Sequence, residues 1–261
     1  MSRNRTSNRQ YPQSSKKSSS RKEKRQYVVE TPQQEPIIKL EPNIRKKFSR
    51  HDMKYVKPLT ENQLLAFQEW GQGQHLVMGG YAGTGKTFVA LYLALQTILD
   101  PSSEQDKIVI IRSAVSTRDI GFMPGTEDEK LSVYESPYQQ ICDKLFSWNN
   151  TYNNLKEIGL IEFESTSFLR GTTFDNAVII VDECQNLENQ SEADTVITRV
   201  GKDTRVIFCG DVLQNDIGRK SACNEIFNIF RKMDTISFVD FKLSDIVRSG
   251  FVRDYLMAKY S

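Results

Sequence analysis

The 261-residue sequence has few of the residues that build metal sites and disulfide frameworks. It contains four cysteines and two histidines. The cysteines are Cys142, Cys184, Cys209 and Cys223. None of them forms the C-x-x-C pair of a zinc site, and their spacing is too wide for a small disulfide-stabilised domain. His51 and His75 are isolated, so we expect no metal site made of Cys and His, and a reducing compartment.

Long apolar runs are also missing. The run Val89–Leu95 is far shorter than the about 20 residues that cross a bilayer. The first residues lack the apolar core of a secretory signal. We therefore expect a protein without a membrane span.

Acidic residues are almost absent from the first 26 positions, which contain nine Lys and Arg and one Glu, a net charge of +8. Residues 27–261 hold the other 26 basic and 32 acidic residues, a net charge of −6. Residues 1–26 contain almost no apolar side chains, so burial cannot offset the conformational entropy that this segment would lose on folding. We therefore expect a disordered tail. Such a tail either attracts nucleic acid or only aids solubility, and its charge favours the first interpretation.

The rest of the chain divides into a linker and one domain. Residues 27–54 are proline-containing and basic at Arg45–Lys47, so they are expected to be extended and to lie outside the core. From residue 55 to 261, short β-branched runs alternate with helix-length amphipathic stretches, which predicts a single doubly wound α/β domain with a mostly parallel sheet. We expect strands at His75–Met78, Lys107–Ile111, Gly159–Phe163, Ala177–Val181, Arg205–Cys209 and Ile236–Phe241. Helices are expected at Glu61–Trp70, Lys86–Leu99, Pro137–Leu155, Gln190–Val200, Ser221–Lys232 and Ser244–Lys259.

A phosphate-binding loop, G-Y-A-G-T-G-K-T, follows the first expected strand and leads into a helix. Glycines let the backbone N–H groups wrap a polyphosphate, Lys86 reaches the β- and γ-phosphates, and Thr87 ligates Mg²⁺. A glycine-rich turn without a ligand is the alternative. The predicted nucleotide-binding residues are Gly80, Tyr81, Ala82, Gly83, Thr84, Gly85, Lys86 and Thr87.

Two acids, Asp182 and Glu183, end the buried run that starts at Ala177. In a parallel sheet the carboxyl ends of the strands meet at one edge, so these acids should lie beside the phosphate loop. Asp182 is the predicted outer-sphere partner of Mg²⁺, and Glu183 the base that orients the attacking water. An acidic helix N-cap is the alternative.

Glutamine side chains flank the same region. The strand at 205–209 leads to Asp211 and Gln214, and the Gln214 amide can touch the γ-phosphate or the attacking water. Upstream, Thr60 and Gln63 form a capping-box pattern, so Gln63 is either a helix cap or an adenine-binding residue.

Over Leu59–Tyr260 the chain resembles the PhoH-like proteins, RecA-like P-loop ATPases close to superfamily 1 helicases. The resemblance rests on G-Y-A-G-T-G-K-T, R-S-A-V-S-T-R-D-I-G-F-M-P-G, F-L-R-G-T-T-F-D-N-A-V-I-I-V-D-E-C-Q-N, T-R-V-G, G-D-V-L-Q-N-D and D-I-V-R-S. Departures from the usual family pattern stand at Ser113, Arg118–Asp119, Cys184 and Ser249, and none of them removes a phosphate-loop or Mg²⁺ residue.

The resemblance implies a cytoplasmic, Mg²⁺-dependent ATPase linked to RNA metabolism, in the host cytoplasm if a phage encodes it. By analogy with helicases, Gln63 would touch adenine, Gln185 and Gln214 would couple nucleotide state to nucleic acid, and Arg248 would contact the γ-phosphate. Arg248 could instead be a helix-surface cation paired with Asp245 or with solvent. Arg112, Arg170 and Arg199 are either strand contacts or ordinary surface arginines.

Three functions are consistent with these motifs. The first is an ATP-driven motor or remodeller on single-stranded nucleic acid, RNA rather than DNA. The second is a thymidine-kinase-like phosphotransferase, although its four-cysteine zinc site is missing, and the third is an ATP-dependent switch. Because helicase-type ATPases bind nucleotide between two RecA-like domains and this chain has strands for one, a homo-oligomeric ring is expected, most plausibly a hexamer, with Arg248 or Arg199 donated in trans.

Overall fold

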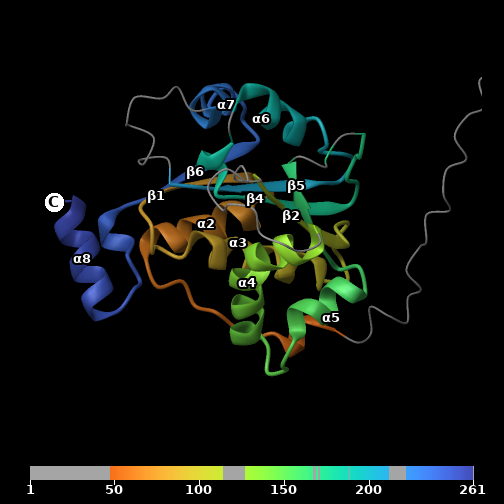
Figure 1. The fold of residues 1–261 in the computed structure, drawn as a ribbon, viewed down its shortest axis with the longest axis horizontal. Coiled ribbons are helices and arrows are strands. Elements are labelled where there is room, and N and C mark those ends of the chain that lie inside the picture. Colours follow the sequence, from red (N-terminus) through yellow and green to blue (C-terminus); the bar gives the residue numbers. More distant parts are fainter. Residues whose placement is uncertain are drawn as a thin grey trace, which may run out of the picture. The chain divides into compact units, whose positions relative to one another are not determined.

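The computed structural model describes residues 48–113, 127–166, 169, 171–187, 189–211 and 222–260. In these ranges six strands form one sheet in the order β3-β2-β4-β5-β1-β6, and every neighbouring pair is parallel (Figure 1). The strands are β1 (His75–Gly80), β2 (Lys107–Arg112), β3 (Ile161–Ser165), β4 (Ala177–Asp182), β5 (Arg205–Cys209) and β6 (Ile236–Phe241). All six expected strands are present, which confirms the α/β fold class.

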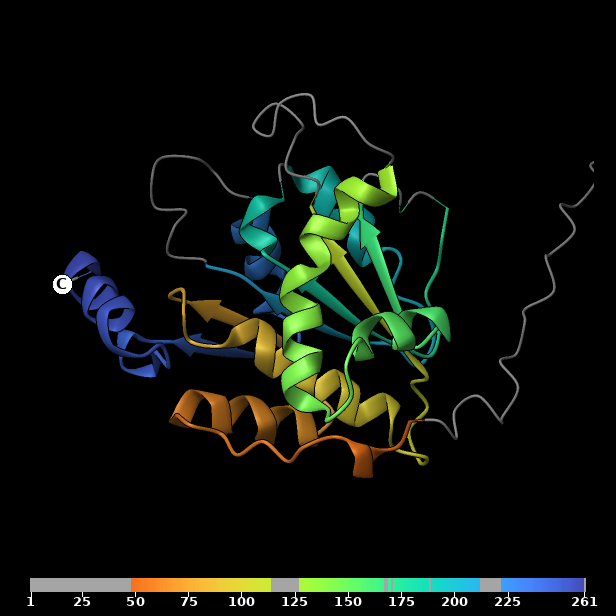
Figure 2. The same cartoon turned by 60° about the horizontal axis from the view of Figure 1, so that its bottom comes forward.

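Helices cover both faces of the sheet, as a doubly wound fold requires. One face carries α2 (Glu61–Gly71), α3 (Lys86–Ile98), α4 (Glu127–Leu145) and α5 (Thr151–Glu157), and the other carries α6 (Gln190–Ile197) and α7 (Ala222–Phe230). Figure 2 shows the first group from the side of α4. The last helix, α8 (Gly250–Tyr260), buries none of its residues.

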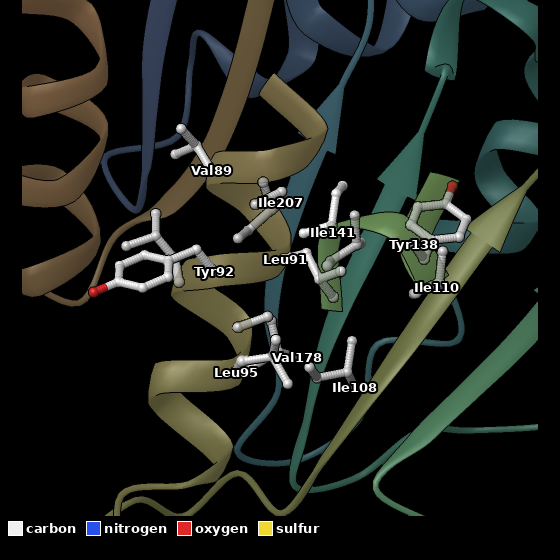
Figure 3. Close-up of a cluster of buried hydrophobic side chains, with 14 of the residues drawn as sticks. Val89, Leu91, Tyr92, Leu95, Ile108, Ile110, Tyr138, Ile141, Val178 and Ile207 are labelled. Atoms are coloured by element: carbon white, nitrogen blue, oxygen red, sulfur yellow. The ribbon is translucent and has the colours of Figure 1, made fainter. Parts of the chain in front are cut away.

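Side chains along each central strand alternate between two apolar cores. On β4, Val178 and Ile180 belong to the core under α3 and α4 (Figure 3), whereas Ile179 and Val181 belong to the core under α6 and α7. Every residue of β4 is therefore buried, which is why this strand appears in the sequence as a continuous apolar run. Its one charged side chain, Asp182, lies at the carboxyl end.

The prediction of a single helix over Pro137–Leu155 is wrong, because two helices, α4 and α5, occupy this region. Pro137 lies inside α4 rather than in a first turn, although an interior proline removes a backbone hydrogen bond from the helix. The break follows Leu145, where Phe146 pairs with Met53. Asn150 then takes a left-handed φ of 59° before α5 begins.

The helix expected over Ser244–Lys259 starts later than the sequence pattern indicates. A short 3₁₀ turn covers Leu243–Asp245, Ile246 is extended, and α8 begins at Gly250. The Val247 N–H donates to the Gly83 carbonyl at 3.1 Å. This contact holds the segment between the two helical pieces extended against the phosphate-binding loop.

The end of the expected linker also differs from the prediction. Phe48 and Met53 are only 4% and 8% exposed and belong to the core under α3 and α4. The Phe48 ring packs edge-on against Trp148, with centroids 5.2 Å apart. The expectation that 27–54 lies outside the core is thus wrong for these two residues. The expectations for residues 1–47 lie outside the described ranges.

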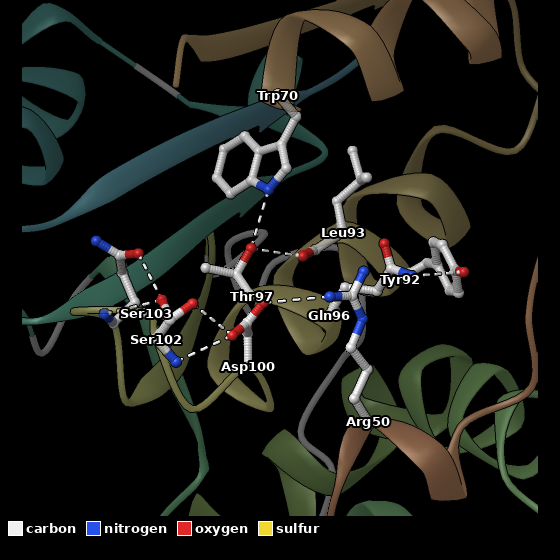
Figure 4. Close-up of polar contacts among 10 residues, drawn as sticks. Arg50, Trp70, Tyr92, Leu93, Gln96, Thr97, Asp100, Ser102 and Ser103 are labelled. Atoms are coloured by element: carbon white, nitrogen blue, oxygen red, sulfur yellow. Dashed lines mark hydrogen bonds and ion pairs between the residues drawn. The ribbon is translucent and has the colours of Figure 1, made fainter. Parts of the chain in front are cut away.

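Polar contacts fasten the end of α3 to its neighbours (Figure 4). The Trp70 indole of α2 donates to Thr97 Oγ1 at 3.0 Å, and Thr97 donates to the Leu93 carbonyl at 2.9 Å. Arg50 lies 3.2 Å from Asp100. These contacts fix α3, whose first turn carries the chemistry of the site.

We predict that Phe48→Ala lowers the free energy of unfolding by about 3–4 kcal/mol, because it leaves a cavity beside Phe146 and Trp148. Tyr55→Ala is the matched control, since the Tyr55 side chain is 83% exposed; it should change stability by less than about 0.5 kcal/mol. Urea unfolding measures both. Equal effects of the two substitutions would show that residues before 55 are not part of the core.

Candidate active site

The loop Gly80–Thr87 connects β1 to α3. Its glycines are needed for different reasons. Gly80 has φ +117°, and a Cβ there would lie 2.0 Å from the Phe241 carbonyl oxygen of β6. Gly83 and Gly85 have φ +80° and +86°, which only glycine adopts freely. The close approach of β6 therefore excludes a side chain at Gly80, and backbone conformation favours glycine at Gly83 and Gly85.

Lys86 lies under the loop at the start of α3. Its Nζ donates to the carbonyls of Gly80 at 2.7 Å and Tyr81 at 2.8 Å. Burial lowers the pKa of Lys86, and the negative charge of Asp211 acts in the opposite direction. The structure thus places a half-buried cation beneath the loop, as the motif predicts.

Asp182 at the end of β4 meets the first turn of α3. It is 5% exposed, its Oδ1 accepts from Thr87 Oγ1 at 3.0 Å, and its Oδ2 accepts from the Tyr138 hydroxyl at 2.7 Å. Burial raises the pKa of Asp182, and the hydrogen bond from Tyr138 opposes that rise. The two predicted Mg²⁺ residues are therefore in direct contact. Tyr138 was missed, because a tyrosine in an amphipathic helix shows no sign of what it faces.

Glu183 follows in a left-handed conformation with φ 51°. Its Oε2 accepts from Gln185 Nε2 at 2.6 Å, and Gln185 Oε1 accepts from the Asp211 N–H at 3.0 Å. Glu183 is the N-cap residue of the 3₁₀ turn that follows, but its side chain makes no cap hydrogen bond to that turn, so the N-cap alternative holds in position only. The chain of contacts links the ends of β4 and β5.

Asp211 lies just past the end of β5 and is 5% exposed. Among the residues that the structure describes, neither of its carboxylate oxygens has a hydrogen-bond partner. The preceding Gly210 is required by packing, since a Cβ there would lie 2.5 Å from Cys184 Sγ. Gln214, predicted from the same motif, lies outside the described ranges.

These groups line one cleft of about 750 Å³. Its floor is the phosphate-binding loop and the carboxyl ends of β4 and β5, and its far wall comes from α4 and the segment before α2. The charged residues that line it are Lys57, Lys86, Arg112, Lys144, Arg248, Asp182, Glu183 and Asp211. Five cations face three acids, an excess that suits a polyanion.

Gln63 supports the loop from α2. Its backbone N–H donates to Thr60 Oγ1 at 3.3 Å, which confirms Thr60 as the N-cap of α2. Its side chain, only 6% exposed, donates to the Thr84 carbonyl at 3.0 Å and accepts from the Leu59 N–H at 2.8 Å. The adenine-binding role stays a prediction.

Arg248 lies against the phosphate-binding loop of its own chain. A Cβ at Gly83 would be 3.0 Å from Arg248 Cγ. The residue precedes α8 rather than lying on a helix, and Asp245 accepts instead from Asn62 and the Lys242 N–H, each at 2.7 Å. The pairing with Asp245 and the placement on a helix are therefore wrong, whereas Arg248 is exposed, so a solvent-facing cation stays the alternative.

The other arginines separate into two places. Arg112 at the end of β2 lines the cleft, and its guanidinium lies over the Tyr134 ring, 5.5 Å from the centroid. Arg199 donates to the Thr172 carbonyl at 3.3 Å, on the segment that enters β4, so it lies at the opposite edge of the sheet. Arg170 is outside the described ranges.

Within those ranges, no group of three or more His, Cys, Asp and Glu side chains has the arrangement of a metal site. A bilayer-spanning helix is likewise absent from the part of the chain that the structure describes.

Comparison with known proteins assigns a family. The family described as PhoH-like protein matches residues 55–260. Protein PhoH of Escherichia coli K12 is 32% identical over 69% of this chain and 51% of its own length. PhoH-like proteins of Synechocystis and Bacillus subtilis are each 33% identical, over 67% and 70% of this chain and 53% and 57% of their own lengths. The chain spans about half the length of the curated relatives it matches.

Solved structures with a similar arrangement are more distant. The Hef helicase domain of Pyrococcus furiosus aligns with a TM-score of 0.42 and 11% identity, covering 71% of this chain and 39% of that one. A Bacteroides Pif1 helicase in complex with ADP-AlF3 and single-stranded DNA aligns with a TM-score of 0.30 and 15% identity, covering 72% and 43%. The match over residues 55–260, together with the Lys86, Thr87 and Asp182 geometry, leads to one assignment: the chain belongs to the PhoH-like protein family of P-loop NTPases.

Proposed function

We propose that this protein binds ATP and hydrolyses it with Mg²⁺, and that it acts on single-stranded RNA or DNA as a helicase-like motor or remodeller. One observation carries the proposal. Thr87 of the phosphate-binding loop donates to Asp182, the acid at the end of β4, within the cleft that also holds Lys86 and Glu183. This is the pairing through which P-loop NTPases hold Mg²⁺ beside the phosphates.

The residues of the cleft fit a magnesium ion. Mg²⁺ in such sites is held by one or two carboxylates together with the phosphates of the nucleotide. Asp182 and Thr87 supply adjoining oxygens, and the buried Asp211 carboxylate has no hydrogen-bond partner in the described part of the chain. When bound, the ion would neutralise charge that develops on the phosphates.

The remaining groups have separate roles in the proposed hydrolysis. Lys86 balances phosphate charge, and Arg248 reaches the γ-phosphate from beside Gly83. Glu183 orients the attacking water, and its hydrogen bond to Gln185 fixes the carboxylate. Gln185 also bonds the backbone of Asp211, so it lies where a change at the phosphate site would reach the segment that contains Gln214.

Two observations support nucleic acid as the partner, with RNA preferred over DNA. The PhoH-like resemblance implies RNA metabolism, and the first 26 residues carry a net charge of +8. A cationic segment attracts phosphate backbones without reading their sequence.

ATP turnover measured with single-stranded RNA, single-stranded DNA and thymidine separates the three functions. Stimulation by a polynucleotide supports the proposal. Phosphorylation of thymidine would identify a kinase, and turnover that no polynucleotide changes would identify a switch.

We predict that Lys86→Ala and Asp182→Asn each reduce ATP hydrolysis at least about a hundredfold, because each removes a charge that balances the phosphates or holds Mg²⁺. Glu183→Gln should retain ATP binding and slow turnover by about 10²–10⁴, the usual contribution of a general base. Asp240→Asn is the matched control, since Asp240 is exposed on β6. Full turnover by Glu183→Gln would exclude the assigned base.

We predict that deleting residues 1–26 weakens RNA binding and flattens its dependence on salt. Each phosphate contact with a single strand contributes about 0.7 to the slope of log K against log salt. A full-length variant with the nine Lys and Arg of this segment replaced by Gln controls for chain length and should behave like the deletion. An unchanged slope of log K against log salt would indicate that the tail does not bind RNA and only aids solubility.

We propose a hexameric ring with nucleotide at each subunit boundary. Because Arg248 lies against the phosphate-binding loop of its own subunit, it is not the arginine donated across the boundary. Arg199, at the opposite edge of the sheet, is the arginine that a neighbouring subunit would donate. Mixing Lys86→Ala with Arg199→Ala subunits should then restore activity at about a quarter of the interfaces of a random ring. Mixing Lys86→Ala with Arg248→Ala should restore none. Light scattering that finds a fully active monomer would contradict the ring.

A further inference from the structure

Tyr138 reaches the predicted magnesium carboxylate from a helix on the other side of the cleft. It lies on α4 and is 0% exposed. Its hydroxyl donates to Asp182 Oδ2 at 2.7 Å, while Thr87 of α3 donates to Oδ1 at 3.0 Å. Each carboxylate oxygen therefore has its own donor, and the two donors come from different helices.

Packing holds the Tyr138 ring in place. Its centroid lies 6.4 Å from that of Tyr152 on α5 and 5.9 Å from that of Phe163 on β3. Figure 3 shows the residue among the apolar side chains of the core under α3 and α4. Burial and the charge of Asp182 raise the pKa of Tyr138 far above its ordinary value, so the phenol stays protonated and acts as a donor.

Two hydrogen-bond donors restrict the rotation of the Asp182 carboxylate more than a single donor would. The torsion that turns an aspartate carboxyl group is broad, so the Thr87 bond alone would leave the carboxylate plane free to rotate about Oδ1. The Tyr138 bond fixes Oδ2 as well. It also favours the ionised form, against the burial that raises the pKa of Asp182.

The same helix also contacts Arg112, the residue of β2 that pairs with Asp182 in the sheet. The Tyr134 carbonyl, one turn before Tyr138, accepts from Arg112 Nη1 at 3.4 Å. Arg112 ends β2, and its charge also favours ionised Asp182. The position of α4 therefore sets two of the groups that surround the carboxylate.

We infer that Tyr138 is a positioning residue for Mg²⁺, which holds the Asp182 carboxylate in the orientation that faces Thr87. The inference rests on the proposed function, in which Asp182 and Thr87 hold the ion. Partners of this kind, which touch a ligand rather than the metal, change metal affinity by about 10–100-fold when they are removed. No other described tyrosine donates to this carboxylate.

The test is Tyr138→Phe, which removes the hydroxyl and keeps the ring. Binding of a fluorescent ADP analogue is measured with EDTA and then during a Mg²⁺ titration. The Mg²⁺ concentration at half-effect should rise about tenfold, while affinity in EDTA stays unchanged. Tyr152→Phe is the matched control, because it removes a hydroxyl from the same aromatic cluster and should leave the Mg²⁺ dependence of wild type.

A double-mutant cycle with Asp182→Asn tests whether Tyr138 acts through that carboxylate. In the Asp182→Asn protein, adding Tyr138→Phe should cause no further change in Mg²⁺ dependence. Identical Mg²⁺ dependence in Tyr138→Phe and wild type would overturn the inference. So would loss of ADP binding in EDTA or of the cooperative thermal transition, since either would make the hydroxyl a general structural group.

The Mg²⁺ dependence of ADP binding tests this inference separately from the proposed ATP hydrolysis. Wild-type protein that binds ADP with Mg²⁺ but hydrolyses no ATP would contradict the proposed hydrolysis and leave the role of Tyr138 measurable. Wild-type protein whose ADP binding ignores Mg²⁺ would overturn the inference.

Discussion

The central strands are covered by apolar side chains on both faces, and this constraint determines where chemistry can occur. A charge in the middle of β4 would be surrounded by two apolar cores with no partner, at a cost of several kcal/mol. On these central strands, polar side chains can therefore leave the sheet only at the strand ends. Asp182 shows the arrangement: it is the last residue of a fully buried strand and is stabilised there by hydrogen bonds from Thr87 and Tyr138.

Because all six strands are parallel, their carboxyl ends lie at one edge. The strand order places β5 between β1 and β4, so the phosphate-binding loop, Asp211 and Asp182 follow adjacent strands. The cleft is thus a consequence of topology, and no residue distant from this edge is needed to form its floor. The C-terminal segment completes it, since Val247 bonds the loop through Gly83.

The parts that the sequence predicts well are those that depend on short-range pattern. Strand positions follow from β-branched runs, and the loop motif with Asp182 identifies the phosphate site. Contacts made across the fold were not predictable in this way. Tyr138 meets Asp182 only because α4 packs beside α3 near the end of β4. Phe48 enters the core only because Phe146, just after α4, lies against it. The predicted helix starts at Pro137 and Ser244 were wrong for the same reason, because tertiary contacts decide where each helix begins.

The position of β1 in the sheet has a consequence for synthesis of the chain. Both of its partners, β5 and β6, come late in the sequence. When β1 leaves the ribosome, about 129 residues must still be added before Cys209 completes β5, which takes roughly 6–26 s at 5–20 residues per second. During that interval the strand that carries the phosphate-binding loop has neither neighbour to pair with. A nascent chain that stops before Arg205 therefore lacks both of the strands that pair with β1 and hold the loop in the sheet.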